Sequence, residues 1–295
     1  MQDLEPRQNK IEYYNYFTIP SGGKYTLYEI QNNEYVVLLK FLQSENYTAF
    51  FNILDNLIEK SIPGFKTFNF IDKVYTYIAF AYYNIHPIVS ISHPKLGSTD
   101  LPITNILDDI EESYEPNYIE FEITKSIKVA IHYPRGFYFE DKNPIIDYST
   151  AIHKIAKNGV WQDLSAENSS LLSETLETSI ASKIENIART SFSKQINVFR
   201  LPLMEPVYVN TNGPEMLYLV CNLMNENLQN YYTGLYVMVH YFKMDKCGFD
   251  SLTPSETAIL LKIMEEDKQK QSKDSKTGGM TIPSAISDEN LFGEA

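Results

Sequence analysis

Two neighbouring segments in the middle of the chain alternate strictly between apolar and polar side chains. In the first, YIEFEI at 118–123, Ile119, Phe121 and Ile123 fall on one face. The second, IKVAIHY at 127–133, alternates in the same way. Successive side chains of a β-strand point to opposite faces, so this period of two predicts two strands that each bury one face. Only the short sequence TKS separates them, which predicts an antiparallel hairpin.

Two segments before this hairpin have helical periodicity instead. From Ser44 onward, apolar side chains recur every three or four residues until the pattern ends near Pro63. A second helix is predicted to begin at Asn69, whose side chain can cap the chain while Asp72 occupies the third helical position. We expect the two helices to form a pair.

The sequence from about Tyr148 onward is predicted to be helical. Gly213 and Pro214 mark the start of one helix. The last helix has the clearest start signal, because Thr253 as N-cap and Glu256 three residues later form a capping box. We expect it to end near residue 269. Earlier in this half, one apolar stripe consists of Leu172, Leu176, Ile180, Ile184 and Ile187.

These patterns predict an α+β protein. An N-terminal mixed α/β domain with a β-hairpin is expected at 1–147, a mainly α-helical C-terminal domain at 148–270, and a flexible polar C-terminal tail at 271–295. The length of 295 residues suits two domains that can each bury a core.

Charge and cysteine content narrow the functional classes. The formal net charge is -13, and the basic residues are spread singly, so we expect no nucleic-acid partner and no anionic membrane surface. The longest near-apolar run, at 74–83, is too short to span a bilayer. Cys221 and Cys247 are too few for a disulfide framework, and no secretion signal is recognisable. These features predict a protein of the reducing cytoplasm.

A glycine-containing stretch near the N-terminus, IPSGGKY at 19–25, resembles a phosphate-binding loop only superficially. A Walker A loop requires a glycine at position 18 and a serine or threonine at position 25, where this chain has Thr18 and Tyr25. We therefore interpret it as a structural turn. The residues assigned to this turn are Pro20, Ser21, Gly22, Gly23 and Tyr25.

No metal, cofactor or catalytic site is predicted, because the residues that could carry such chemistry are scattered. None of the five histidines has the helical partner or neighbouring cysteine of a zinc site. The acidic run at 108–115 lacks the order of a calcium-binding loop and is interpreted as a solvated face. Cys221 is expected to be a small buried apolar residue. The histidines are His86, His93, His132, His153 and His240.

The C-terminal helices are rich in tyrosine and methionine. They can form a helical core, or they can present a surface that binds a partner protein, and both can hold at once. The candidate partner-binding residues are Tyr231, Tyr232, Tyr236, Tyr241 and Phe242.

Four segments, taken in order, resemble the baseplate hub proteins of T4-like tailed bacteriophages. They are IPSGGKY at 19–25, FIDKVYTYIAFAYYNI at 70–85, ITKSIKVAIHYP at 123–134 and LTPSETAILLKIMEEDKQKQ at 252–271. The family includes a hub subunit and a hub-assembly factor. The resemblance implies no active site. It implies contacts with other phage baseplate or tail proteins during tail assembly in the infected cell.

The sequence leaves three hypotheses open. The first is a non-enzymatic phage tail protein that stays in the baseplate hub of the virion. The second is a chaperone or assembly factor that acts in the host cytoplasm and leaves the particle. The third, from another class, is a metal-independent hydrolase or transferase whose site is assembled in space from acidic residues and histidines. The first two predict neither cofactor nor small-molecule substrate.

Overall fold

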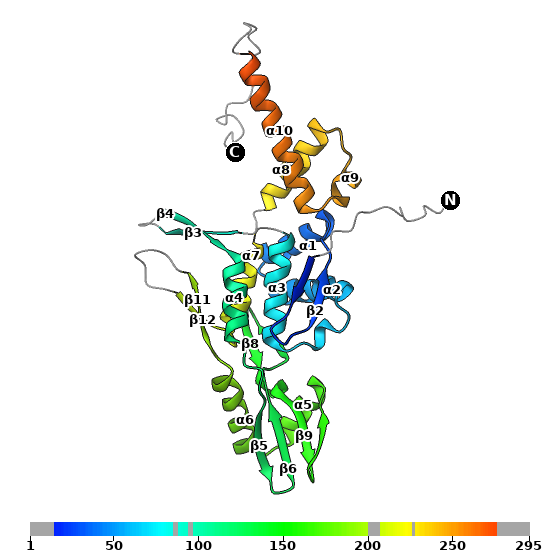
Figure 1. Cartoon of the computed structure of the whole chain (residues 1–295). Coiled ribbons are helices and arrows are strands. Elements are labelled where there is room, and N and C mark those ends of the chain that lie inside the picture. Colours follow the sequence, from blue (N-terminus) through cyan, green and yellow to red (C-terminus); the bar gives the residue numbers. More distant parts are fainter. Residues whose placement is uncertain (1–14, 85–87, 94–96, 200–206, 226–227, 276–295) are drawn as a thin grey trace, which may run out of the picture. The chain divides into compact units, whose positions relative to one another are not determined.

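The computed structural model describes residues 15–84, 88–93, 97–199, 207–225 and 228–275 (Figure 1). The chain divides into two compact units, 1–254 and 255–295. In the second unit the described part is helix α10 (Pro254–Ser275), which begins at the predicted residue and extends beyond the predicted end near 269. The first five residues of the predicted tail are therefore helical. The rest of that tail, 276–295, lies outside the described residues.

The chain contains both helices and strands, as the α+β prediction requires. Its N-terminal part begins with a short antiparallel hairpin, continues with three helices, and ends with a second hairpin and a fourth helix. These elements are β1 (Asn15–Thr18), β2 (Lys24–Leu27), α1 (Asn32–Gln43), α2 (Tyr47–Ser61), the 3-10 turn η1 (Phe65–Thr67), α3 (Phe70–Asn84), β3 (Ile88–His93), β4 (Gly97–Pro102) and α4 (Ile103–Ser113).

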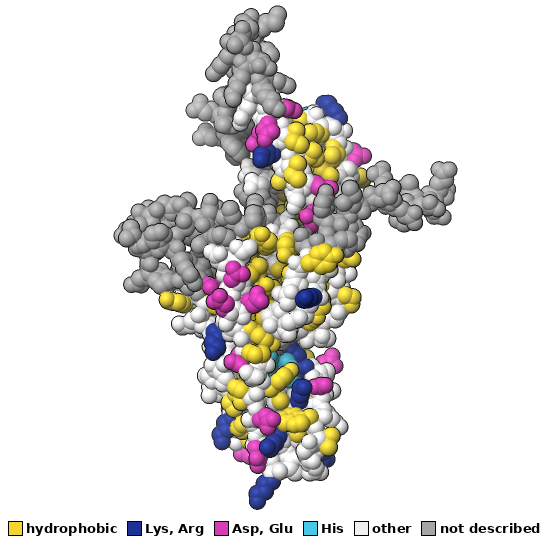
Figure 2. All heavy atoms as spheres, in the orientation of Figure 1, with side chains coloured by type: hydrophobic (Ala, Val, Ile, Leu, Met, Phe, Trp, Pro, Cys, Tyr) yellow, Lys and Arg dark blue, Asp and Glu magenta, His cyan; other side chains and the backbone are white. Residues whose placement is uncertain are grey.

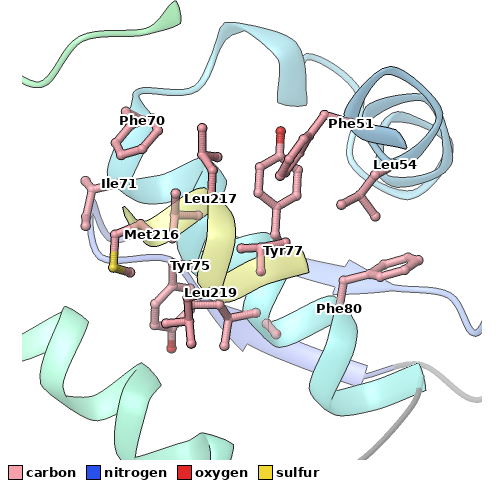
Figure 3. Packing of buried hydrophobic residues seen from close by; sticks show 14 of the residues in the cluster. Phe51, Leu54, Phe70, Ile71, Tyr75, Tyr77, Phe80, Met216, Leu217 and Leu219 are labelled. Carbon is pink, nitrogen blue, oxygen red and sulfur yellow. The ribbon is translucent and has the colours of Figure 1, made fainter. Parts of the chain in front are cut away.

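Helix α3 is the centre of the core. Every side chain from Phe70 to Ala81 is buried, which explains why its sequence is apolar on all sides rather than along one stripe. The predicted cap is present, because the side chain of Asn69 accepts a hydrogen bond from the backbone N–H of Asp72 at 2.9 Å. Figure 3 shows Phe51 of α2 against Tyr77 of α3, with their ring centroids 5.4 Å apart.

The alternating segments form the predicted hairpin. Strands β5 (Ile119–Thr124) and β6 (Ile127–Ile131) pair antiparallel, with Phe121 opposite Val129. They belong to a four-stranded sheet of order β10-β9-β6-β5. Its other strands, β9 (Ile152–Lys157) and β10 (Val160–Asp163), come later in the chain. Because β6 pairs with β9, this sheet joins residues on the two sides of the domain boundary predicted at 147.

The prediction that the chain is helical from about residue 148 is wrong for β9 and β10, and also for the later strands β11 (Gln195–Phe199) and β12 (Val207–Asn210). A two-residue turn connects β9 to β10, and its residues Asn158 and Gly159 have φ values of 52° and 82°. Two successive positive φ angles define the tight hairpin turn for which Asn-Gly is the favoured sequence. The turn sets the antiparallel register, and pairing with β6 completes the ladder.

The remaining elements mix hairpins with helices. They are β7 (Gly136–Glu140), β8 (Asn143–Asp147), the 3-10 turn η2 (Tyr148–Ala151), α5 (Ala166–Thr175), α6 (Thr178–Ser191), β11 (Gln195–Phe199), β12 (Val207–Asn210), α7 (Glu215–Met224), α8 (Leu228–Tyr241) and α9 (Lys246–Ser251). The predicted apolar stripe at 172–187 is divided between α5 and α6, because Leu176 and Glu177 have extended ψ angles that interrupt the helix.

One hydrophobic core runs through the first unit, from Phe17 to Met224. It contains side chains of α3, β6, α6 and α7, so both predicted domains contribute to it. Figure 3 shows Met216, Leu217 and Leu219 of α7 beside α3. Among the helices that the structure describes, none is both long and apolar enough to cross a membrane.

Candidate functional site

Helix α8 presents a row of exposed aromatic side chains. Tyr232 and Tyr236, four residues apart and therefore on one face, are 48% and 59% exposed. Tyr241 and Phe242 at the end of the helix are 53% and 36% exposed. Figure 2 shows hydrophobic side chains gathered where α8 lies in Figure 1. We call Tyr232 and Tyr236 the α8 aromatic face. Tyr241 comes nine residues after Tyr232, which is two and a half helical turns, so it leaves the helix on the opposite side, and Phe242 follows the last residue of α8.

The opposite side of α8 packs against the protein. Gly234 and Met238 are buried there, and α8 contacts α1 and α9. Tyr231 belongs to this inner side, because its ring lies 5.3 Å from that of Phe249 and its hydroxyl donates to Asp250 at 3.1 Å. Tyr231 is therefore half-buried at the inner edge of this group, and its ring still contacts that of Tyr232, with the centroids 5.3 Å apart.

The residues Pro20 to Gly23 lie in the turn that connects β1 and β2. The N–H of Gly22 donates to the carbonyl of Ile19 at 2.8 Å, and Gly22 has a φ of 94°, a conformation that favours glycine. A Cβ on Gly23 would lie 2.6 Å from the ring of Tyr25, so a larger residue there would displace that ring. Tyr25 packs beside the turn, with its ring 5.2 Å from that of Phe68.

A third feature, which the sequence did not reveal, is a polar cluster at a cavity of about 280 Å³ between α2, α3 and β7. The hydroxyl of Tyr77 donates to Oδ1 of Asp55 at 2.5 Å. Lys73 is only 6% exposed, and its Nζ donates to the carbonyl of Arg135 at 2.8 Å. Asp55 and Lys73 both line the cavity, beside aromatic rings that include Phe51 and Phe137.

Burial changes the acid–base properties of this cluster. It raises the pKa of the Asp55 carboxyl above its usual value, and the hydrogen bond from Tyr77 opposes that change only in part. Burial also lowers the pKa of the Lys73 ammonium, although Asp55 acts in the other direction. Both changes follow from the cost of placing a charge in a medium of low polarity. Such groups beside a cavity can exchange protons with a bound molecule.

A signal for this cluster does exist in the sequence. Lys73 and Asp72 are the two charged residues of FIDKVYTYIAFAYYN, a helix that is otherwise almost entirely apolar and aromatic. A charged residue in a buried helix requires a polar partner. The identity of those partners depends on α2 and on residue 135, which the sequence of α3 does not specify.

The structure also brings together two histidines that are 21 residues apart. The rings of His132 and His153 lie 5.5 Å apart, between Tyr118 and Tyr133. Nε2 of His132 is 2.9 Å from the carbonyl of Glu115, and Nε2 of His153 is 2.8 Å from that of Tyr133. Burial lowers the pKa of both histidines, that of His153 to about 3. Both are hydrogen-bonded to backbone carbonyls, His132 as a buried residue and His153 as a half-buried one.

The other predicted residues fall in varied places. Cys221 is buried, as expected, and Cys247 is exposed. The acidic run begins on α4, where Asp108 and Glu111 face solvent. His86 lies outside the described residues. Within the described ranges, no three side chains of His, Cys, Asp or Glu come together in a group that could hold a metal ion.

The chain was compared with known proteins in three ways. No family model, no curated protein sequence and no solved structure matches it.

Proposed function

We propose that this protein is a non-enzymatic component or assembly factor of a phage tail baseplate hub and acts through protein–protein contacts. The observation that carries the proposal is the α8 aromatic face. Tyrosine and phenylalanine are enriched where proteins associate, because each ring covers a large apolar area while losing few rotamers, and the tyrosine hydroxyl can still find a hydrogen-bond partner. Two such rings side by side on an exposed helical face are therefore suited to a protein partner.

A second observation concerns the segments that carry the family resemblance. Three of the four meet at the N-terminus of α3. The N–H of Ser21, in the first segment, donates to Asp72 of the second at 3.1 Å. The N–H of Phe70, in the second, donates to the carbonyl of Pro134 at the end of the third, at 2.7 Å. Their physical connection supports treating them as parts of one shared architecture rather than as separate coincidences.

The proposal is tested by co-sedimentation of the purified protein with phage tail or baseplate extracts. We expect the wild type to sediment with a tail or baseplate protein. The double variant Tyr232→Ser/Tyr236→Ser should bind that partner roughly 30-fold more weakly, the effect of losing about 2 kcal/mol at an interface centre.

A matched control removes two tyrosines of similar exposure elsewhere. Tyr16→Ser/Tyr208→Ser changes side chains that are 78% and 56% exposed on β1 and β12. This variant should sediment like the wild type. Equal loss in both double variants, or no partner in any tail extract, would contradict the proposal.

The retained and transient roles differ in where the protein is found after assembly. Mass spectrometry of purified virions should detect a hub component at a fixed ratio to other baseplate proteins. An assembly factor should be present in lysates of infected cells and absent from the virions. The α8 aromatic face is compatible with both roles, and we therefore propose them as one function with two possible fates.

The cavity at Asp55 and Lys73 favours a second candidate, a metal-independent hydrolase or transferase. Its chemistry would depend on the carboxyl and the amine, because no histidine lines that cavity within the described residues. The test is a panel of chromogenic esters, phosphoesters and glycosides with the wild type and the Asp55→Asn variant. Turnover that disappears in Asp55→Asn would support the enzyme; equal rates in both would exclude a role for this carboxyl.

A further inference from the structure

One edge of strand β7 borders the cavity that Asp55 and Lys73 line. β7 pairs with β8 in a sheet of two strands, so its other edge has no partner strand in the described part of the chain. Side chains of successive strand residues point to opposite faces, and a cavity that meets four successive residues therefore follows the edge of the strand. No residue of β8 lines this cavity, which contacts β7 at Gly136, Phe137, Tyr138 and Phe139.

The backbone groups at this edge have no hydrogen-bond partners. Phe139 lies opposite Pro144, which has no N–H to donate, so the two form a pair that exchanges no hydrogen bonds. Such pairs alternate with bonded pairs along an antiparallel ladder, and the next one joins Phe137 and Ile146. The N–H and C=O of Phe137 and Phe139 therefore point away from β8. Within the described residues, these groups make no hydrogen bond.

Helix α2 forms the opposite wall of the cavity. The ring of Phe51 lies 5.3 Å from that of Phe137 and 5.4 Å from that of Phe139, and these contacts hold the helix beside the strand. The wall is one face of the helix, because its residues are spaced three or four apart. They are Thr48, Phe51, Asn52 and Asp55. We call the space between this wall and residues 136–139 the β7 groove. A groove between a strand edge and a helix suits an extended peptide that pairs with the strand.

Asp55 supplies an accessible acceptor in the β7 groove. Its Oδ1 accepts a hydrogen bond from the hydroxyl of Tyr77 at 2.5 Å, whereas its Oδ2 accepts none from the described residues. Oδ2 is open to solvent, because the one buried side-chain oxygen or nitrogen without a partner in the described part of the chain is Oδ1 of Asn212. Lys73 lines the same groove, and its positive charge already acts on Asp55. A ligand therefore needs a neutral hydrogen-bond donor here rather than a further cation.

We propose that the β7 groove binds an extended peptide segment of another protein. The backbone of the segment would continue the sheet by exchanging hydrogen bonds with Phe137 and Phe139. Every second side chain of the segment would face α2. One of these side chains would be a serine, threonine, asparagine or glutamine that donates to Oδ2 of Asp55.

This inference goes beyond the proposed function and does not depend on it, because no residue of the α8 aromatic face lines the β7 groove. It shares Asp55 with the enzymatic candidate, but its measurement is the binding of a peptide, which requires no turnover. Failure of either test therefore leaves the result of the other unchanged.

The test begins with a synthetic library of random octapeptides, from which the full-length protein selects its tightest binder. The Kd of this peptide, labelled with fluorescein, is measured by fluorescence anisotropy. The peptide is then made again with one backbone nitrogen methylated at a time. Methylation removes an N–H donor, so the Kd should rise roughly tenfold at every second residue, where the N–H faces β7, and by less than about threefold at the residues between. This period of two is specific to strand pairing.

Variants locate the bound peptide. Asn52→Trp changes an exposed residue that lines the β7 groove, and its ring should fill the groove and weaken binding of the selected peptide at least roughly tenfold. Asn56→Trp places the same ring at an exposed position of α2 that does not line the groove, and should change the Kd by less than about twofold. Asp55→Asn keeps an acceptor for Tyr77 and should weaken binding roughly tenfold, because the carboxylate is the stronger acceptor.

Four results would overturn the inference. They are a library that yields no binder, methylation that acts alike at every position, equal binding by the two tryptophan variants, and wild-type binding by Asp55→Asn.

Discussion

The backbone N–H of Ser21 donates a hydrogen bond of 3.1 Å to Oδ1 of Asp72, although 51 residues separate the two in the sequence. Asp72 is buried and also accepts a hydrogen bond from Nδ2 of Asn69 at 2.7 Å. One carboxylate therefore fixes the turn between β1 and β2 to the first turn of α3. The turn itself lies at the surface, and this hydrogen bond joins it to the buried end of α3.

Replacing this carboxylate should destabilise the protein. In Asp72→Ala the N–H of Ser21 and the amide of Asn69 lose their acceptor in a partly buried place, at a cost of about 2 kcal/mol in the free energy of unfolding. Urea unfolding followed by far-UV circular dichroism measures this change. Asp108→Ala, on the exposed side of α4, should change it by less than about 0.5 kcal/mol. Equal effects of the two substitutions would contradict the anchoring role.

The lysine of the turn should be dispensable. Lys24 is exposed at the start of β2. We expect Lys24→Ala to leave both the free energy of unfolding and co-sedimentation with baseplate proteins nearly unchanged, within about 0.5 kcal/mol for stability. Binding of ATP by the wild type, and its loss in Lys24→Ala, would show that the stretch is a phosphate loop after all.

The turn between β9 and β10 should tolerate only certain substitutions. Gly159 has a φ of 82°, so Gly159→Ala forces a Cβ into the left-handed region and should cost about 1 kcal/mol of stability. The matched change Asn158→Gly keeps a residue that accepts positive φ and should alter stability by less than about 0.5 kcal/mol. Urea denaturation of the two variants distinguishes these outcomes, and an equal loss in both would argue against the Asn-Gly turn.

The half-buried histidine His153 should make stability depend on pH. Burial lowers its pKa in the folded protein to about 3, while in the unfolded chain it is about 6.5. Between these two pH values the unfolded chain therefore holds a proton on the imidazole that the folded protein does not hold. The stabilising contribution is complete above pH 6.5 and is lost as the pH falls toward 3, with a slope of up to about 1.4 kcal/mol per pH unit.

The variant His153→Gln separates the contribution of this histidine from those of the other side chains that titrate between pH 6.5 and 4. Its side-chain amide can still donate to the carbonyl of Tyr133, and it does not titrate. We expect a smaller loss of stability between pH 6.5 and 4 in His153→Gln than in the wild type, measured by urea unfolding at each pH. His240→Gln changes an exposed histidine and should retain the wild-type slope. Parallel pH profiles for all three proteins would refute the assignment.

Features governed by a few neighbouring residues were predictable. The hairpin of β5 and β6 follows from strict alternation, and the starts of α3 and α10 follow from Asn69 and Pro254. The Asn-Gly turn at 158–159 carried an equally local signal, the sequence KNGV between β9 and β10. The helical pattern predicted from about residue 148 onward masks this local signal.

The sequence by itself determined several local elements: the strands β5 and β6 through their period of two, the Asn69 cap of α3, and the turn that contains Gly22. Only the tertiary structure decided that Asp55 meets Tyr77, that Lys73 reaches the carbonyl of Arg135, and that Oδ1 of Asn212 has no donor. The physical reason is one of range. Periodicity and capping act over about four residues, whereas these contacts join residues 22 to 62 positions apart or depend on which donors pack nearby.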